Sequence, residues 1–165
     1  MVITANISQT LDAKDRKILN LVQRDGKLPQ AEVARRVGLS AAAVNERLKK
    51  LENAGVIRRY VAVVDPHAVG ASVTAFVEVF IEHPRFEPAF IAKVRAMHEV
   101  QEVHHITGEF SLLLKLRTSG MEALQQLLIH HLNALEGVRQ TRTVIALSTS
   151  KEESFVSAGA EGETQ

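Results

Sequence analysis

Three helical patterns open the chain. Apolar positions spaced by three and four residues predict helices over residues 12–24, 29–37 and 41–54. Gly38 can take the positive φ of a tight turn between the last two, and Ser40 can cap the helix that follows. This pattern is typical of a helix-turn-helix, whose second helix usually lies in a DNA major groove.

Further along the chain, apolar and polar residues alternate, which predicts strands. The alternating segments are a strand-like connector at residues 56–64, then 72–82, 100–106, 111–117 and 138–147. One helix is expected between the first two strands, with Pro88 near its start. Ser119 and Glu122 are expected to form a capping box for a second helix, which Gly137 ends. The order β-α-β-β-α-β predicts a ferredoxin-like unit and an α+β fold class.

These patterns divide the chain into five parts. We expect a flexible arm at residues 1–10, a helix-turn-helix domain at 11–60 and a connector at 61–71. A ferredoxin-like domain for effector binding and oligomerisation follows at 72–149, and a polar, disordered tail at 150–165.

The predicted sheet has apolar side chains on both faces. Along residues 72–82, Val77 and Val79 point to one face, while Phe76 and Phe80 point to the other. Two helices can cover only one face of such a sheet. We therefore expect a second subunit to cover the other face, which makes the protein at least a dimer.

Charge is distributed unevenly along the chain. Residues 1–60 contain twelve Lys/Arg and six Asp/Glu, whereas the remainder contains eight and thirteen. A basic N-terminal third indicates a polyanionic partner. The absence of cysteine excludes disulfides and fits a cytoplasmic protein, and there is neither a signal-peptide pattern nor an apolar run that could span a membrane. One Tyr and no Trp disfavour stacking on single-stranded nucleic acid.

The third predicted helix combines small, polar and basic residues on its outer face. Small alanines at its start allow close approach to the groove floor, Asn45 could pair with adenine, and Glu46 could accept from a cytosine amino group. Basic residues around it are expected to hold phosphates. Arg47 lies near the core edge and could either brace the domain or touch the DNA backbone. The candidate DNA-binding residues are Lys27, Arg35, Arg36, Ser40, Ala42, Ala43, Asn45, Glu46, Arg47, Lys49, Lys50, Arg58 and Arg59.

A set of short motifs runs through both halves of the chain in a recognisable order. They are Asp12, Asp15, Ile18, Leu19, Asp25-Gly26, Val37-Gly38-Leu39-Ser40, Val44, Arg47, Leu51-Glu52, Gly55-Val56-Ile57, Tyr60, Asp65-Pro66, Phe76-Val77, Thr107-Gly108, Leu113-Leu114, Gly137-Val138 and Thr141-Arg142-Thr143. Over residues 11–149, this order and spacing resembles the Lrp/AsnC (leucine-responsive, feast/famine) family of transcriptional regulators.

The resemblance implies a winged-helix-like DNA-binding domain followed by an effector-binding domain. It also implies dimers that assemble further, often into octamers, and an amino acid bound between dimers. The positions that match the family's effector site are His105, Thr107, Gly108, Glu109, Ser111, Met121, Thr143, Val144 and Ile145. Many relatives place Asp where this chain has Ser111, so Glu109 could replace its contact with the ammonium group, the effector could differ, or there could be none.

Metal binding and catalysis are disfavoured by the residue spacing. His104 and His105 are adjacent in a strand and point to opposite faces, while His130 and His131 are about 100° apart on a helix. No hydrolase, phosphate-loop or metalloprotease motif is present. One alternative is a haem-pathway, siroheme-type decarboxylase, which resembles the same family and uses strand histidines. The basic helix and the lack of an aromatic, arginine-rich strand favour a cytoplasmic, non-enzymatic regulator of transcription that binds double-stranded DNA and needs no metal or cofactor.

Overall fold

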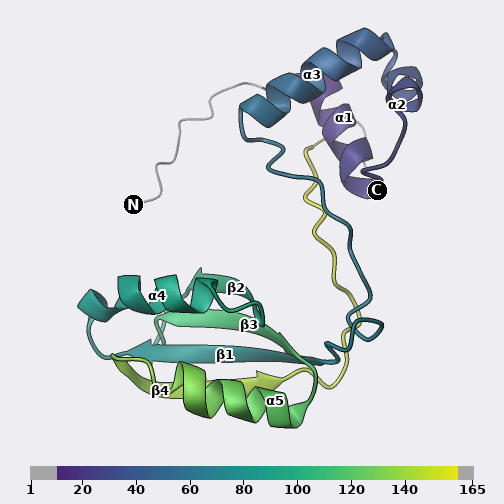
Figure 1. Cartoon of the computed structure of the whole chain (residues 1–165). Coiled ribbons are helices and arrows are strands. Elements are labelled where there is room, and N and C mark those ends of the chain that lie inside the picture. The colour runs from purple at the N-terminus through teal and green to yellow at the C-terminus, as the bar shows by residue number, and fades with distance from the viewer. Residues whose placement is uncertain (1–10, 160–165) are drawn as a thin grey trace. The chain divides into compact units, whose positions relative to one another are not determined.

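The computed structural model describes residues 11–159. The chain forms two units, and Figure 1 shows the elements of each. One unit extends to Ala62 and resumes at Glu152, whereas the other spans Val63–Lys151. The first unit is therefore built from two separate stretches of the sequence. The predicted flexible arm, residues 1–10, lies outside the described residues.

The N-terminal unit contains the three predicted helices, α1 (Ala13–Arg24), α2 (Gln30–Val37) and α3 (Ala41–Asn53). Their apolar faces meet in a small core in which Ile18 and Val44 are fully buried. Burial of such side chains is the main force that holds short helices together.

Specific backbone and side-chain contacts define where these helices begin and end. Asp12 caps α1 by accepting from the Asp15 N–H at 2.7 Å. Gly38 has a φ of 65° at the end of α2, and the Ser40 hydroxyl accepts from the Ala43 N–H at 3.1 Å. The predicted turn glycine and helix cap are confirmed.

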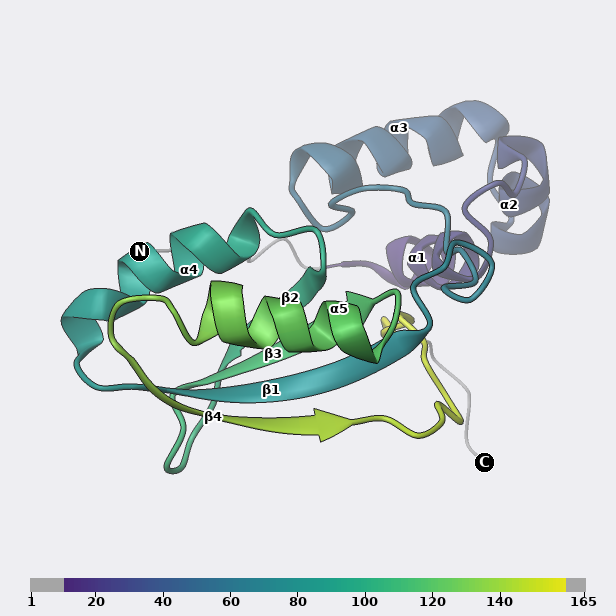
Figure 2. The same cartoon turned by 60° about the horizontal axis from the view of Figure 1, so that its bottom comes forward.

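The C-terminal unit is a four-stranded antiparallel sheet with the order β2-β3-β1-β4. Its strands are β1 (Val73–Ile81), β2 (Val100–His105), β3 (Leu112–Thr118) and β4 (Val138–Ile145). The helical segments are η1 (Pro84–Phe86), α4 (Glu87–Arg95), α5 (Met121–Gln126) and the π-helix η2 (Leu127–Leu132). Figure 2 shows α4 and α5 on the same face of the sheet. The predicted ferredoxin-like α+β fold is confirmed, although the last helix changes from α to π after Gln126.

The two faces of this sheet differ sharply in burial. On the helix-covered face, Val77, Val79 and Leu114 are fully buried. On the opposite face, Phe76 and Phe80 are only partly buried within the chain. The sequence correctly separated these two sets of β1 side chains because neighbouring residues of a strand point to opposite faces.

Two local predictions were wrong. Residues 56–64 do not form a strand, and Val61 and Val63 are exposed there, because β propensity alone cannot make a strand without a pairing partner. The Ser119–Glu122 capping box is also absent, because α5 begins one residue later with Gly120 as its N-cap.

The C-terminal tail is another departure from expectation. Residues 150–159 have no regular secondary structure, but Val156 and Ala158 hydrogen-bond to side chains of α1. The backbone of this part of the tail therefore has hydrogen-bond partners on a helix surface, which the sequence did not predict. Residues 160–165 lie outside the described part of the chain.

Gly137, which precedes β4, has a φ of +85°, and a Cβ atom there would collide with Cβ and the ring of Phe86. We expect Gly137→Ala to lower the free energy of unfolding by about 3 kcal/mol, from backbone strain plus overpacking. Gly70→Ala is the matched control, because Gly70 has a φ of +76° with nothing within 4 Å of the added atom. Urea unfolding of the full chain measures both, and equal losses would contradict the collision.

Candidate DNA interface and effector site

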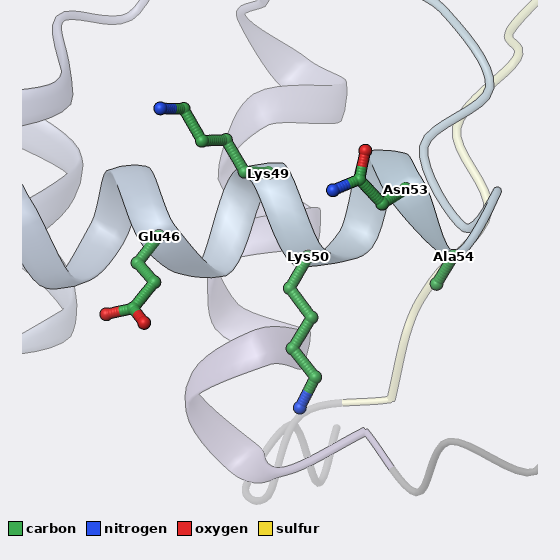
Figure 3. A pocket seen from close by; sticks show the side chains of 5 residues that line it. All are labelled: Glu46, Lys49, Lys50, Asn53 and Ala54. Atoms are coloured by element: carbon green, nitrogen blue, oxygen red, sulfur yellow. The ribbon is translucent and has the colours of Figure 1, made fainter.

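Helix α3 has one buried and one open face. Val44, Leu48 and Leu51 are buried against α1 and α2, whereas Glu46, Lys49 and Lys50 are exposed. Figure 3 shows these three exposed side chains extending away from the ribbon of α3. Together with Asn53 and Ala54 they line a shallow hollow of about 470 Å³. This face presents two ammonium groups, a carboxylate and an amide to whatever contacts the helix.

The N-terminal turn of α3 has small side chains on its outer surface. Ala42 is exposed and Ala43 is partly buried, so no long side chain prevents the helix from approaching another molecule. Asn45 is also partly buried, and its Oδ1 accepts from Gln30 Nε2 at 3.4 Å. The Ser40 hydroxyl already accepts a capping hydrogen bond, which leaves its proton available for donation.

Arg47 braces the N-terminal unit. Its Nη1 donates to Asp12 Oδ2 at 2.6 Å and to Asp15 Oδ1 at 2.7 Å, which joins α3 to the capping box of α1. Hydrogen bonds from the Asp15 backbone and from Arg47 lower the pKa of Asp12, and the two carboxylates raise the pKa of Arg47. Of the two roles considered for Arg47, this geometry favours the bracing role.

Arg35 and Arg36 share one carboxylate on their own helix. Arg35 binds Glu32 through two hydrogen bonds, at 2.8 and 2.7 Å, and Arg36 Nε donates to Glu32 Oε1 at 2.6 Å. Hydrogen bonds from Arg35 and then Arg36 lower the pKa of Glu32 to about 2. Both arginines remain exposed, so they can reach a phosphate, but Glu32 neutralises part of their charge.

The remaining predicted phosphate contacts flank the helices. Lys27 is exposed in the turn after α1, and Arg58 and Arg59 are exposed after α3. The next residue, Tyr60, anchors this segment because its hydroxyl donates to Glu52 Oε1 at 3.1 Å. Partial burial, together with the Glu52 carboxylate, raises the pKa of Tyr60 to about 12.

The sequence list of DNA-contact candidates omitted Asn53. This side chain is exposed and lines the same hollow as Lys49 and Lys50. Its position four residues after Lys49 was the available signal, since residues i and i+4 of a helix lie on one face.

The nine predicted effector residues fall into two groups at opposite ends of the sheet. The Ser111 N–H donates to the Val79 carbonyl, which places the β2–β3 loop beside one end of β1. Ile145 pairs with Ala75 near the other end. Thr143 pairs with Val77, so Thr143 and Ile145 lie two and four residues along β1 from Val79, or about 7 and 13 Å. Strand β1 also lies between β3 and β4, so the two groups occupy separate places on one chain. The loop group is His105, Thr107, Gly108, Glu109 and Ser111, and the second group is Met121, Thr143, Val144 and Ile145.

Both groups present accessible atoms. Gly108 has a φ of 119° at the tip of the β2–β3 loop, a backbone conformation that favours glycine. In the second group, the apolar side chains of Met121 and Val144 are 57% and 54% exposed. Both groups are therefore open to contact with another molecule.

The histidines show no metal-site geometry. His104 Nε2 lies 3.0 Å from Glu102 Oε2, whereas His105 Nε2 lies 3.6 Å from Glu87 Oε2 on the first turn of α4. Within residues 11–159, no group of three or more His, Asp or Glu side chains could hold a metal ion. No helix in that range is long and apolar enough to cross a membrane.

Two family models match the chain in the order of its two units. Residues 11–58 match a model described as winged helix-turn-helix DNA-binding, and residues 74–156 match the Lrp/AsnC ligand binding domain. The leucine-responsive regulatory protein of Salmonella typhimurium is 40% identical over 144 residues, which cover 86% of this chain and 88% of that protein. The same-named protein of Klebsiella pneumoniae is 39% identical with the same coverage.

Solved structures agree with the sequence matches. A transcriptional regulator from Neisseria meningitidis in complex with L-methionine superposes with a TM-score of 0.84 at 34% identity, covering 88% of this chain and 95% of that one. The feast or famine regulatory protein from M. tuberculosis, also in complex with L-methionine, has a TM-score of 0.83 at 33% identity, covering 89% and 99%. AsnC from E. coli has a TM-score of 0.81 at 27% identity, covering 87% and 97%. These comparisons give no support to the decarboxylase alternative.

The bracing role of Arg47 makes a direct prediction. Arg47→Ala leaves the buried Asp15 carboxylate without its guanidinium partner, so we expect the free energy of unfolding to fall by about 1–2 kcal/mol. Lys49→Ala, two residues along the same helix but fully on its exposed face, should change it by less than about 0.5 kcal/mol. Urea unfolding of the two full-length variants compares them, and an unaffected Arg47→Ala would contradict the bracing role.

Proposed function

This chain belongs to the Lrp/AsnC family of DNA-binding transcriptional regulators, and from that premise we propose that α3 is its recognition helix and that an amino acid adjusts its affinity for DNA. The observation that supports the first part best is the exposed face of α3, where two lysines follow a turn of small alanines. Small residues let the helix enter the major groove, and cations beside them bind phosphates.

The side chains of α3 divide into two proposed roles. Asn45 and Glu46 read base edges, because an amide can pair with adenine and a carboxylate can accept from cytosine. Lys49 and Lys50 hold phosphates, with Lys27, Arg58 and Arg59 extending the contact along the backbone. Arg35 and Arg36 contribute less than their charge suggests because Glu32 binds both.

We propose that the open face of the sheet is a subunit interface. Phe76, Phe80 and Leu113 lie on it, partly buried within the chain, among side chains that already form ion pairs. Arg142 pairs with Glu78, and Lys115 Nζ lies 3.2 Å from Glu102 Oε1. Apolar area with internally neutralised charge suits a face that meets a copy of itself, because little unpaired charge must be desolvated. The dimer would present two recognition helices to one face of a pseudo-palindromic DNA site.

The separation of the effector residues supports a site shared between subunits. The β4 residues of the second group lie about 7 to 13 Å along β1 from the loop group, and β1 lies between β3 and β4. A loop group from one subunit would therefore meet a Met121 and β4 group from another. Such a site would form only on further assembly of dimers, for example into an octamer. An amino acid bound there would stabilise the larger assembly, because it would bind that assembly more tightly than it binds a free dimer. This difference in affinity would shift the equilibrium between assembly states.

We propose an amino acid as the effector, with L-methionine as the first ligand to test, because two similar regulators have been solved with it. Backbone N–H groups near Gly108 would bind the carboxylate, and Met121 would supply an adaptable wall for the side chain. Ser111 carries no charge, so Glu109 would accept from the ammonium group in its place.

We further propose that the protein acts in the cytoplasm, where the DNA of a bacterial cell lies, without catalysing a reaction and without a bound cofactor. Its output is occupancy of an operator, set by the assembly state and by the amino acid. This role fits a chain whose similar relatives are regulators of transcription.

A double substitution tests the DNA interface. Lys49→Ala with Lys50→Ala should weaken binding to every duplex and lower the slope of log affinity against log salt by about one unit per lost phosphate contact. Lys93→Ala with Arg95→Ala, on the exposed surface of α4, removes the same charge from the other unit. Fluorescence anisotropy over a salt series measures the slopes, and a slope unchanged from that of the parent would reject the two phosphate contacts.

Calorimetry tests the effector. L-methionine should release or absorb heat on binding to the parent, and Met121→Ala should weaken binding about tenfold through lost apolar contact. Gln125→Ala, at another exposed position of α5, serves as the control and should bind as the parent does. If none of the twenty amino acids binds the parent, the amino-acid proposal fails while the DNA-binding proposal stands.

A further inference from the structure

Helix α1 has a polar stripe that the DNA interface does not use. Arg16, Asn20, Gln23 and Arg24 follow one another at spacings of four, three and one, which places them on one side of the helix. The buried Ile18 and Leu19 lie on the face that packs against the other helices. All four residues of the stripe contact the C-terminal tail.

The tail binds this stripe as an extended peptide. The Gln23 side chain pairs with Val156 in both directions, donating to its carbonyl at 2.9 Å and accepting from its N–H at 3.0 Å. At Ala158, the N–H donates to Asn20 Oδ1 at 3.0 Å and the carbonyl accepts from the Arg16 guanidinium. The amides of Gln23 and Asn20 and the guanidinium of Arg16 thus replace the partners that a neighbouring strand would give these backbone groups.

Apolar and charged contacts accompany these hydrogen bonds. The Ala158 side chain packs against the core of the N-terminal unit, and the Arg24 guanidinium lies 5.1 Å from the centre of the Phe155 ring. The tail, residues 150–165, contains four glutamates and one lysine. Lys17, Arg24 and Arg36 line a cavity of about 620 Å³ bordered by α1, α2 and the tail, so the charges of the two partners are complementary.

We infer that this docked tail is a strap, a second chain link that holds the DNA-binding unit to the rest of the protein. The chain leaves the N-terminal unit at Ala62 and returns to it at Glu152 after completing the sheet. About ten residues separate β4 from Phe155, which limits the reach of this link to about 35 Å. With the tail docked, two links restrict the orientation of the recognition helix, and with the tail released only one does.

The strap can be tested without DNA or an amino acid, so its failure is distinct from failure of the proposed function. Hydrogen exchange of the parent should show the Val156 and Ala158 amides protected. Gln23→Ala with Asn20→Ala should accelerate their exchange by about tenfold, the effect of losing a net hydrogen bond at each. Ser154→Ala, at an exposed tail position, should change nothing. Unprotected amides in the parent would overturn the docking.

A second measurement tests restriction of the unit. The chain has no cysteine, so Ala31→Cys and Ala92→Cys give one labelling site on the exposed surface of each unit. Spin labels there, in subunits diluted with unlabelled protein, should give a narrow distance distribution in the parent background. Phe155→Ala combined with Gln23→Ala should broaden it, while Ser154→Ala should not. The same width in all three backgrounds would overturn the strap even if the tail is docked.

Discussion

The sheet of the C-terminal unit is covered by helices on one face only. The proposed assembly depends on the apolar side chains of the other face and on whether a second subunit covers them. Burial of Val77, Val79 and Leu114 beneath α4, α5 and η2 stabilises the unit. It does not bury Phe76 and Phe80, because their side chains point to the other face. In the proposed dimer, a second copy would cover these side chains and would bring a second recognition helix. The geometry of one strand would then link dimerisation to DNA binding.

Some charged side chains of the N-terminal unit pair with one another, while others stay exposed to a partner. The net charge of the unit does not distinguish these two groups. Arg47 holds two carboxylates of α1, and Glu32 holds Arg35 and Arg36. These ion pairs orient helices and side chains. They also neutralise part of the positive charge that the N-terminal unit presents to a polyanion such as DNA. Lys49 and Lys50 stand on the exposed face of α3, where attraction to phosphate is least compromised.

Local chemistry made much of this fold predictable. Gly38 and Ser40 placed the helix-turn-helix correctly because a positive φ and a hydroxyl cap are requirements of a few neighbouring residues. The alternation of side chains along β1 correctly predicted which of them point to each face of the sheet. Residues 56–64 were misjudged because a strand requires a partner that local sequence does not specify. The π-helix after α5 was missed because apolar spacing alone does not distinguish it from a continued α-helix.

The candidate sites were predictable as residue types but not as arrangements. Periodicity placed Lys49 on the outer face of α3, yet it could not decide between the two roles of Arg47, which depend on Asp12 and Asp15 more than thirty residues away. The resemblance to the Lrp/AsnC family gathered His105 and Met121 into one effector site. Only the register of the sheet showed that these two groups lie at different ends of it.

The division of the chain also has a consequence for biosynthesis. A ribosome makes the helices of the N-terminal unit first, but the tail residues that complete this unit are made last. Domains that emerge early usually fold early, so the sheet can fold while α1 still lacks its final partner. Synthesis of the DNA-binding unit therefore starts before the sheet and is completed after it, and the polar stripe on α1 stays uncovered while the ribosome translates the sheet.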